Sequence, residues 1–273
     1  MRKIFYSIVL LIGIFYSCKK TDIGVDNLDL TQSYRLKKEI HNPNERTEAV
    51  DSYFYNENGL ISRIESVRRT FYVMHSGQVV DEIDTVLQTF EYTNGLCTKW
   101  NIQKKGSPFI LDYYEFNYNT KNLPVSRIHY KKEAPTEYRS YVYDNSDRLI
   151  KVTDTVNTSQ YRRYEFTYGK DNNIESIAEY NGNKITYVSL DDMVNYTKAI
   201  KGLPLSFAFD ESYPSYPSYF SLSPHNKLIE VSQSGYGTKD TISYLYQYNE
   251  VGLPVNRKTS PGGATVIFEY EKK

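Results

Sequence analysis

A short aromatic motif recurs along most of this chain and constrains its fold more than any other feature. The motif is an aromatic residue, any residue, a Tyr and a polar turn, followed by Leu or Ile, as in Phe166-x-Tyr168 and then Ile174. A repeat at a fixed period is typical of an architecture built from copies of one supersecondary unit. The second aromatic position of successive copies is occupied by Tyr55, Tyr92, Tyr118, Tyr143, Tyr168, Leu222, Tyr248 and Tyr270.

Each copy predicts two antiparallel strands. In the copy around Tyr164, Phe166 and Tyr168, the aromatic residues alternate with Glu165 and Thr167, which is the pattern of a half-buried strand. One Asn-, Asp- and Gly-rich turn follows each aromatic strand, and a second, more variable turn lies midway through each period of about 25 residues. The sequence therefore predicts an all-β antiparallel meander of roughly 16 to 18 strands, curled into a barrel or into an open rolled sheet.

One segment departs from this pattern. The interval from Tyr168 to Leu222 is about two periods long, so one copy is missing there. Ser189 and Asp192 resemble a capping box, and a helical stripe of apolar residues ends before Gly202. We therefore expect one short inserted helix over residues 190–201, placed to plug or cap the sheet.

The N-terminus has the pattern of a secretion signal. Two basic residues precede an apolar run from Ile4 to Tyr16, which is too short to span a bilayer comfortably. Ser17-Cys18 then resembles the lipobox of bacterial lipoproteins, which implies cleavage before Cys18 and lipidation of that residue. The predicted organisation is a lipoprotein signal peptide at 1–17, the lipidated Cys and a flexible tether at 18–33, and a single β domain at 34–273. The alternative is an ordinary signal peptide with an incidental Cys.

The composition indicates no nucleic-acid partner and no cofactor. The 33 Lys and Arg residues balance 33 Asp and Glu residues, so no basic surface for nucleic acid is implied. The four His residues are scattered, so we expect no metal site. Glu82 and Asp84 share one strand face and suit a hard cation, although a solvated strand explains them more simply. Once Cys18 is lipidated, Cys97 stands alone and is expected to be a small core residue.

One aromatic segment does not follow the repeat. The prolines between Tyr213, Tyr216 and Tyr219 favour polyproline II, which has three residues per turn, so the three rings would form one ridge. One interpretation is a loop that packs its aromatic rings over an open end of the sheet. The other is a binding ridge for a glycan or for a protein of the cell envelope. This ridge is the candidate ligand-binding site of the chain.

Two stretches carry a resemblance to known proteins. Tyr143-Asp-Asn-Ser-Asp-Arg-Leu149 and Tyr55-Asn-Glu-Asn-Gly-Leu60 resemble the YD repeats of RHS-type proteins. Together with the lipobox, they resemble an uncharacterised family of Bacteroidetes lipoproteins with a porin-like β fold. The resemblance implies a barrel-like shape and no catalytic residues. Because expected outward positions such as Arg163 and Glu165 are charged, we favour a water-soluble barrel over an integral porin.

The sequence leaves more than one class of function open. No catalytic motif is present, and a repeat sheet offers a broad surface, so we favour a non-catalytic binding module that recognises a glycan or an envelope protein. An envelope hydrolase with a dispersed carboxylate site is the alternative, and a purely structural scaffold is another. The expected location is the outer membrane, through the lipid anchor, on its cell-surface or periplasmic side.

The anchor makes a direct prediction. Cells that express the protein should incorporate radiolabelled fatty acid into it, because lipidation attaches acyl chains to Cys18. Each buried CH₂ of these chains contributes about 0.8 kcal/mol of membrane binding. The Cys18→Ala variant should carry no label, and Cys97→Ala should be labelled like the wild type. Equal labelling of the Cys18→Ala variant would contradict lipidation at this residue.

Overall fold

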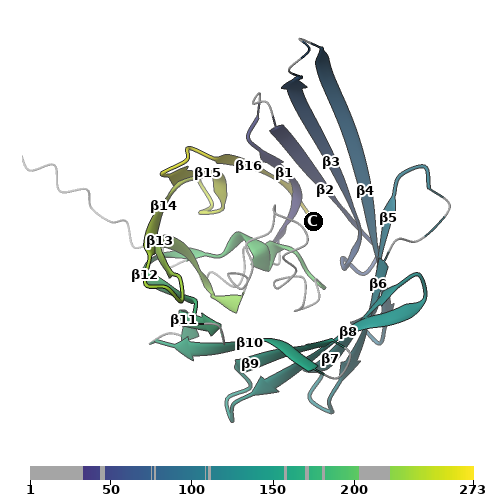
Figure 1. The fold of residues 1–273 in the computed structure, drawn as a ribbon, viewed down its shortest axis with the longest axis vertical. Coiled ribbons are helices and arrows are strands. Elements are labelled where there is room, and N and C mark those ends of the chain that lie inside the picture. The colour runs from purple at the N-terminus through teal and green to yellow at the C-terminus, as the bar shows by residue number, and fades with distance from the viewer. Residues whose placement is uncertain are drawn as a thin grey trace, which may run out of the picture.

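The chain folds into a closed β-barrel (Figure 1). The structure is a computed structural model that describes residues 33–43, 47–74, 76, 78–107, 109, 112–156, 159–169, 172–179, 182–202 and 222–273. Within them, each strand pairs antiparallel with its neighbour in sequence, and β1 pairs with β16 to close the ring. The predicted all-β antiparallel meander is confirmed, and of the two shapes left open the closed barrel is correct.

The barrel contains sixteen strands within the described residues, which lies inside the predicted range. The first eight are β1 (Tyr34–His41), β2 (Thr47–Tyr55), β3 (Ile61–Val73), β4 (Val79–Thr93), β5 (Leu96–Lys104), β6 (Asp112–Tyr118), β7 (Pro124–Lys131) and β8 (Ala134–Tyr143). The others are β9 (Leu149–Val156), β10 (Ser159–Tyr168), β11 (Ile174–Glu179), β12 (Lys184–Val194), β13 (His225–Gln233), β14 (Lys239–Tyr248), β15 (Pro254–Ser260) and β16 (Thr265–Lys272). A single 3-10 turn, η2 (Tyr196–Ala199), follows β12.

One end of the barrel, here called the turn end, is built from copies of one five-residue turn. The side chain of the first turn residue accepts hydrogen bonds from two backbone N–H groups, as Asn56 Oδ1 does from Asn58 and Leu60 at 3.0 Å each. The fourth residue has a positive φ, which Gly59 adopts without steric cost. The same arrangement is built on Asn119, Asp144 and Asn249. These are the Asn- and Asp-rich turns that the sequence predicts.

The second aromatic of the repeat ties neighbouring strands together at the turn end. The hydroxyl of Tyr168 donates to the carbonyl of Leu149, the first residue of β9, at 2.7 Å. Tyr143 donates to Pro124 O at 2.8 Å and Tyr118 to Cys97 O at 2.7 Å. Tyr55 and Tyr92 make the equivalent bonds to Leu36 O and Ile61 O. These rings are half-buried and pack against the core rather than lying fully inside it.

The first aromatic of the repeat points into the barrel and is buried. Cross-strand partners stack in a row, with ring centroids 6.2 Å apart for Phe90 and Trp100 and 4.5 Å apart for Trp100 and Tyr114. Such pairs stabilise a sheet by about 0.2–1 kcal/mol each. Two groups of buried residues line opposite stretches of the wall; the first includes Leu36, Ile64, Trp100 and Phe268, and the second Tyr141, Val152, Phe166 and Ile177.

The inserted helix expected over residues 190–201 is wrong. Residues 190–194 complete β12, with Leu190 opposite Lys227 and Val194 opposite His225 across several register shifts. Asp191 accepts hydrogen bonds from the backbone N–H of Met193 and of Asn226, both at 3.0 Å. Pairing with β13 therefore overrides the local helical pattern, and β12 is the strand of the repeat that seemed to be missing. Within 190–201, only the single turn η2 is helical.

The connection between β12 and β13 does enter the turn end of the barrel, where Figure 1 shows the green segment after β12 inside the ring of strands. Ile200 belongs to the first buried group, and Leu222 packs against the second. Lys201 O accepts a hydrogen bond from Ile61 N at 2.9 Å, and Gly202 O accepts one from the Tyr92 hydroxyl at 3.1 Å. The described parts of this segment thus bridge two sides of the wall.

Several predicted features lie outside the described residues. They are the signal peptide, Cys18, the tether up to residue 32, and the ridge of Tyr213, Tyr216 and Tyr219. Among the residues described, no helix is long and apolar enough to cross a membrane.

The hydrogen bonds from the repeat tyrosines to backbone carbonyls predict how the stability of the barrel responds to substitution. Tyr168→Phe should lower the free energy of unfolding by about 1 kcal/mol, because it removes one hydrogen bond and keeps the ring. Tyr168→Ala should cost roughly 3 kcal/mol, since the ring contacts are lost as well. Urea unfolding followed by circular dichroism measures both. Tyr138→Phe is the control, because Tyr138 is 46% exposed. An equal effect of Phe at both positions would contradict the structural role of these hydrogen bonds.

Candidate functional site

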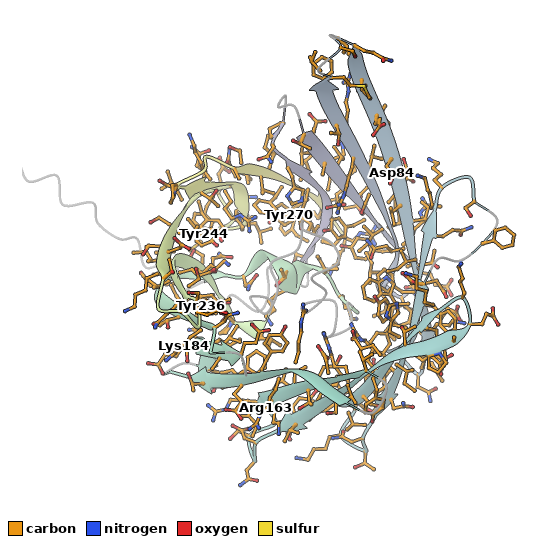
Figure 2. The ribbon with its side chains drawn as sticks, viewed as in Figure 1. Asp84, Arg163, Lys184, Tyr236, Tyr244 and Tyr270 are labelled. Carbon is orange, nitrogen blue, oxygen red and sulfur yellow. The ribbon has the colours of Figure 1, made fainter. Side chains whose placement is uncertain are left out.

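A polar cavity of about 500 Å³ lies at the barrel end opposite the turn end, here called the loop end. At this end the chain passes from β1 to β2 and from β15 to β16. The cavity, here called the mouth pocket, extends from this rim toward Lys227 and Tyr244 farther along the lumen; Tyr244 is labelled on the β14 wall in Figure 2. Its lining residues are His41, Asn42, Thr47, Glu48, Ala49, Arg68, Thr70, Lys227, Tyr244, Arg257, Thr259, Ala264, Thr265 and Val266.

Strand alternation turns the polar side chains of the pocket inward. On β3, Arg68 is in phase with the buried Ile64 and Ser66, while Arg69 belongs to the outer face. On β15, Arg257 is opposite Tyr246 on one side and Val266 on the other, and both of those neighbours are buried. Arg257 therefore occupies the inner position that apolar residues such as Trp100 and Ile177 hold in other repeats.

His41 is held between two buried carboxylates. Its Nε2 atom is 3.3 Å from Glu39 Oε2 and 3.3 Å from Asp51 Oδ2, and these two acids are only 2% and 1% exposed. Tyr53 donates a hydrogen bond to Glu39 Oε1 at 3.0 Å. Burial by itself would lower the pKa of His41, but hydrogen bonds and charge attraction from Asp51 and Glu39 outweigh it and raise this pKa to about 9. The imidazole is therefore a cation at neutral pH.

A second ion pair lies across the pocket. Lys227 Nζ is 2.5 Å from Glu230 Oε2, and the Tyr244 hydroxyl donates to the same carboxylate oxygen at 3.3 Å. The Lys227 ammonium also lies 4.5 Å from the centre of the Tyr244 ring. Burial lowers the pKa of Lys227, while the charge of Glu230 opposes that shift. Tyr244 thus contributes an aromatic face and a fixed hydroxyl to the cavity wall.

Farther around the wall, inward charges are paired with one another. Arg139 bonds the buried Asp154 through two nitrogens, and Arg127 pairs with Glu137. The Arg127 guanidinium also lies 4.6 Å from the Tyr114 ring centre. Removing one partner of such a buried pair would leave an uncompensated charge at a cost of about 3–5 kcal/mol. Neither pair is among the residues that line the pocket.

The structure places the sequence candidates as follows. Cys97 is 3% exposed and unpaired within the described residues, as expected of a core residue, and burial raises its pKa to about 12. Asp84 contacts Lys104 at 3.0 Å on an exposed part of β4. No group of His, Cys, Asp and Glu in the described part of the chain could hold a metal ion.

No sequence motif predicts the mouth pocket. His41, Arg68, Lys227 and Arg257 come from four strands, so their sequence spacing gives no motif. One signal was present, because a basic residue at an inner position of an alternating strand is costly unless it has a role. Which residues of a strand point inward can be decided only when the register of that strand is known, and bulges shift the register in β1 and β12.

The outer wall carries charged side chains. Arg163 pairs with Glu165 on β10, and Arg69 pairs with Asp81 at 2.6 Å. Glu165 is more than half exposed, and Glu175 on the next strand is also exposed. Charge at these positions matches the sequence expectation of polar outward residues.

Comparison with known proteins shows the fold and no family. No protein-family model matches the chain, and no curated protein matches it. The chain is similar to a porin-like protein from Bacteroides uniformis, with 13% identity and a TM-score of 0.59, over 86% of this chain and 98% of that one. It also aligns with the TcdB2-TccC3-TEV structure at 11% identity and a TM-score of 0.31, over 81% of this chain but 13% of that one, which is too weak to argue from. The expected porin-like fold is confirmed, while the lipoprotein and YD-repeat resemblances stay predictions.

The His41 cluster predicts a pH-dependent stability. The pKa of His41 is about 9 in the fold and about 6.5 in an unfolded chain, so its contribution is complete below pH 6.5 and lost as the pH rises through 9. The stability difference between wild type and His41→Gln should therefore be largest near pH 6, at roughly 3 kcal/mol, and shrink toward pH 10. Tyr236→Ala, at a fully exposed position, is the control and should show a flat difference. A flat profile for His41→Gln would contradict the assignment.

Proposed function

We propose that this protein is a lipid-anchored, non-catalytic binding module of the cell envelope and that its mouth pocket binds a glycan. The observation that carries the proposal is the position of the pocket relative to the chain ends. β1 begins and β16 ends at the turn end, where Lys273 N donates to Ser33 O at 2.9 Å. A tether from Cys18 would therefore hold the turn end toward the membrane and present the loop end outward.

The chemistry of the pocket suits a hydroxylated ligand. Thr47 and Thr70 supply hydroxyl groups that can donate and accept hydrogen bonds, while Thr259 and Thr265 already donate to backbone carbonyls and can still accept. Arg68 and Arg257 add planar groups with several donors, and the Tyr244 ring, over which Lys227 lies at 4.5 Å, adds aromatic surface to the wall. A cavity of about 500 Å³ is within the usual range for small-ligand sites.

The same geometry argues against catalysis in the pocket. His41 is the histidine that lines it, and at neutral pH this residue is a cation, so it has no lone pair to act as a general base. Glu39 and Asp51 are buried behind His41, do not line the pocket, and are occupied by that cation. Glycoside hydrolysis normally needs a pair of carboxylic groups that reach the substrate, whereas Glu48 is the one carboxylate among the described residues that line the pocket.

The porin-like fold agrees with a location at the outer membrane. The charged outer wall favours a barrel that contacts water and is attached through the lipid. The ridge of Tyr213, Tyr216 and Tyr219 stays a second proposed contact for a glycan or envelope protein. A purely structural scaffold would need no polar cavity. Detection of ligand binding therefore distinguishes a binding module from a structural scaffold.

A glycan array tests the pocket. The soluble domain, residues 34–273, should bind a subset of neutral or acidic envelope glycans, and Arg68→Glu should weaken that binding about tenfold or more, because a charge-assisted hydrogen bond contributes about 1.5–3 kcal/mol. Arg69→Glu is the matched control, since Arg69 neighbours Arg68 but lies on the outer face and should leave binding unchanged. Equal loss in both variants would contradict the pocket.

The same glycan array tests the ridge as an alternative binding site. Replacing Tyr213, Tyr216 and Tyr219 together with Ala should leave glycan binding unchanged if the mouth pocket is the only site. Loss of binding in this variant, with normal binding by Arg68→Glu and an unchanged melting temperature, would move the site to the ridge. Turnover of a bound glycan that disappears in Glu48→Gln, the carboxylate that lines the pocket, would instead support the hydrolase.

A further inference from the structure

A hairpin arm extends past the loop end of the barrel. β3 has 13 residues and β4 has 15, while β2 on one side and β5 on the other have 9 each. Figure 1 shows β3 and β4 projecting beyond the ring, and Asp84 is labelled on this arm in Figure 2. The repeat period is longest at this point of the sequence, so the arm is an extension of one repeat.

The β4 strand of the arm has an unpaired edge. Its pairing with β5 ends at Val86 opposite Lys104, and Lys105 N makes one last bond to Thr85 O at 2.9 Å. Beyond that bond, no described strand pairs with this side of β4. Met74 N bonds Gln78 O, and antiparallel alternation then turns the peptide groups of Val79, Asp81 and Ile83 away from β3.

The arm also exposes an unusual share of apolar side chains. Val79 is 56% exposed and Ile83 67%, and both lie on the outer face of β4. Phe71, Val73 and Met74 are 40%, 58% and 43% exposed. These five residues make up almost half of the eleven large hydrophobic side chains that are exposed in the described part of the chain. An unpaired edge that exposes apolar side chains is a template for pairing with another strand.

We propose that the outer edge of β4, from Val79 to Asp84, binds an extended segment of a partner protein that alternates basic and apolar residues. The segment adds a strand to the arm on the side of β4 where pairing with β5 ends after Lys104. Backbone hydrogen bonds to Val79, Asp81 and Ile83 provide the affinity, and the side chains of alternate residues provide the specificity.

The side chains of β4 determine the chemistry of the occupant. On the outer face Val79 and Ile83 favour apolar neighbours, and Asp81 between them is already paired with Arg69. On the other face Glu82 and Asp84 favour basic neighbours, so a strand that alternates basic and apolar residues matches both faces. β5, the strand that already pairs with β4, supplies a basic neighbour of this kind. Its last residue is Lys104, whose Nζ atom is 3.0 Å from Asp84, and Lys105 follows.

A second copy of the chain fits this edge less well. An antiparallel pair of β4 edges centred on Asp81 would place Asp81 opposite itself and would bring three acids from each strand together. Like charges directly opposite each other in a sheet are destabilising. Arg69 offsets the charge of Asp81 from the β3 side, at 2.6 Å, but it lies one strand away from the edge.

Peptide binding tests the proposal. The probe is a fluorescently labelled seven-residue peptide of alternating Lys and Val, and the soluble domain should bind it in an anisotropy titration. The same peptide with alternate backbone nitrogens methylated should not bind, because it cannot complete the ladder. Hydrogen exchange at the amides of Asp81 and Ile83 should slow on binding, while those of Val80 and Glu82, already paired with β3, should change little.

Two proline variants give a matched comparison. Ile83→Pro removes an edge N–H without breaking the β3–β4 ladder and should weaken peptide binding about tenfold or more. Val73→Pro makes the same kind of change on the opposite edge of the arm and should leave binding unchanged. Equal binding of the methylated peptide, or unchanged exchange at Asp81 and Ile83, would overturn the proposal. So would a concentration-dependent dimer that Ile83→Pro abolishes, since the occupant would then be a second copy.

Discussion

The hydrogen-bonded pairing of β1 with β16 is the constraint on which the rest of the structure depends. It joins the first and last strands of the described barrel in register from Tyr34 opposite Lys272 to His41 opposite Val266. Without this seam the sheet would expose two long edges, which are sites of unwanted association. The seam also builds the mouth pocket, because His41 and Val266 are paired across it and both line the cavity.

The inner face of the closed wall combines aromatic stacking with paired charge. Stacked rings such as Trp100 and Tyr114 enclose apolar surface, while Arg139 with Asp154 places a complete ion pair among them. A buried pair recovers its desolvation cost only with good geometry, so it adds little net stability but strongly disfavours a wrong register. This division explains how one repeat can form both a packed wall and a polar cavity. The cavity lies where basic residues such as Arg68 and Arg257 occupy inner positions.

The two ends of the barrel have different roles. At the turn end, four of the described connections are the same five-residue turn, and five tyrosines donate in the same way to a backbone carbonyl of a neighbouring strand. The β12–β13 connection also enters the lumen there. At the loop end the connections vary, and both the mouth pocket and the β3–β4 arm lie there. Variable connections on a rigid scaffold are where binding residues are usually located. An anchor at the turn end would leave both surfaces accessible to partners.

The sequence by itself determined the strand type, the approximate strand number and the turns, because these depend on alternation and on residues such as Asn56 and Gly59 that act within a few positions. It did not determine barrel closure, since nothing local to Tyr34 or Lys272 shows that they pair. The helix expected over 190–201 was wrong for the same reason, because pairing with β13 outweighed a local capping pattern. The mouth pocket was decided only by the tertiary structure. His41, Arg68, Lys227 and Arg257 converge because closing the sheet brings distant strands around one lumen, and inward direction depends on bulges that sequence periodicity does not reveal.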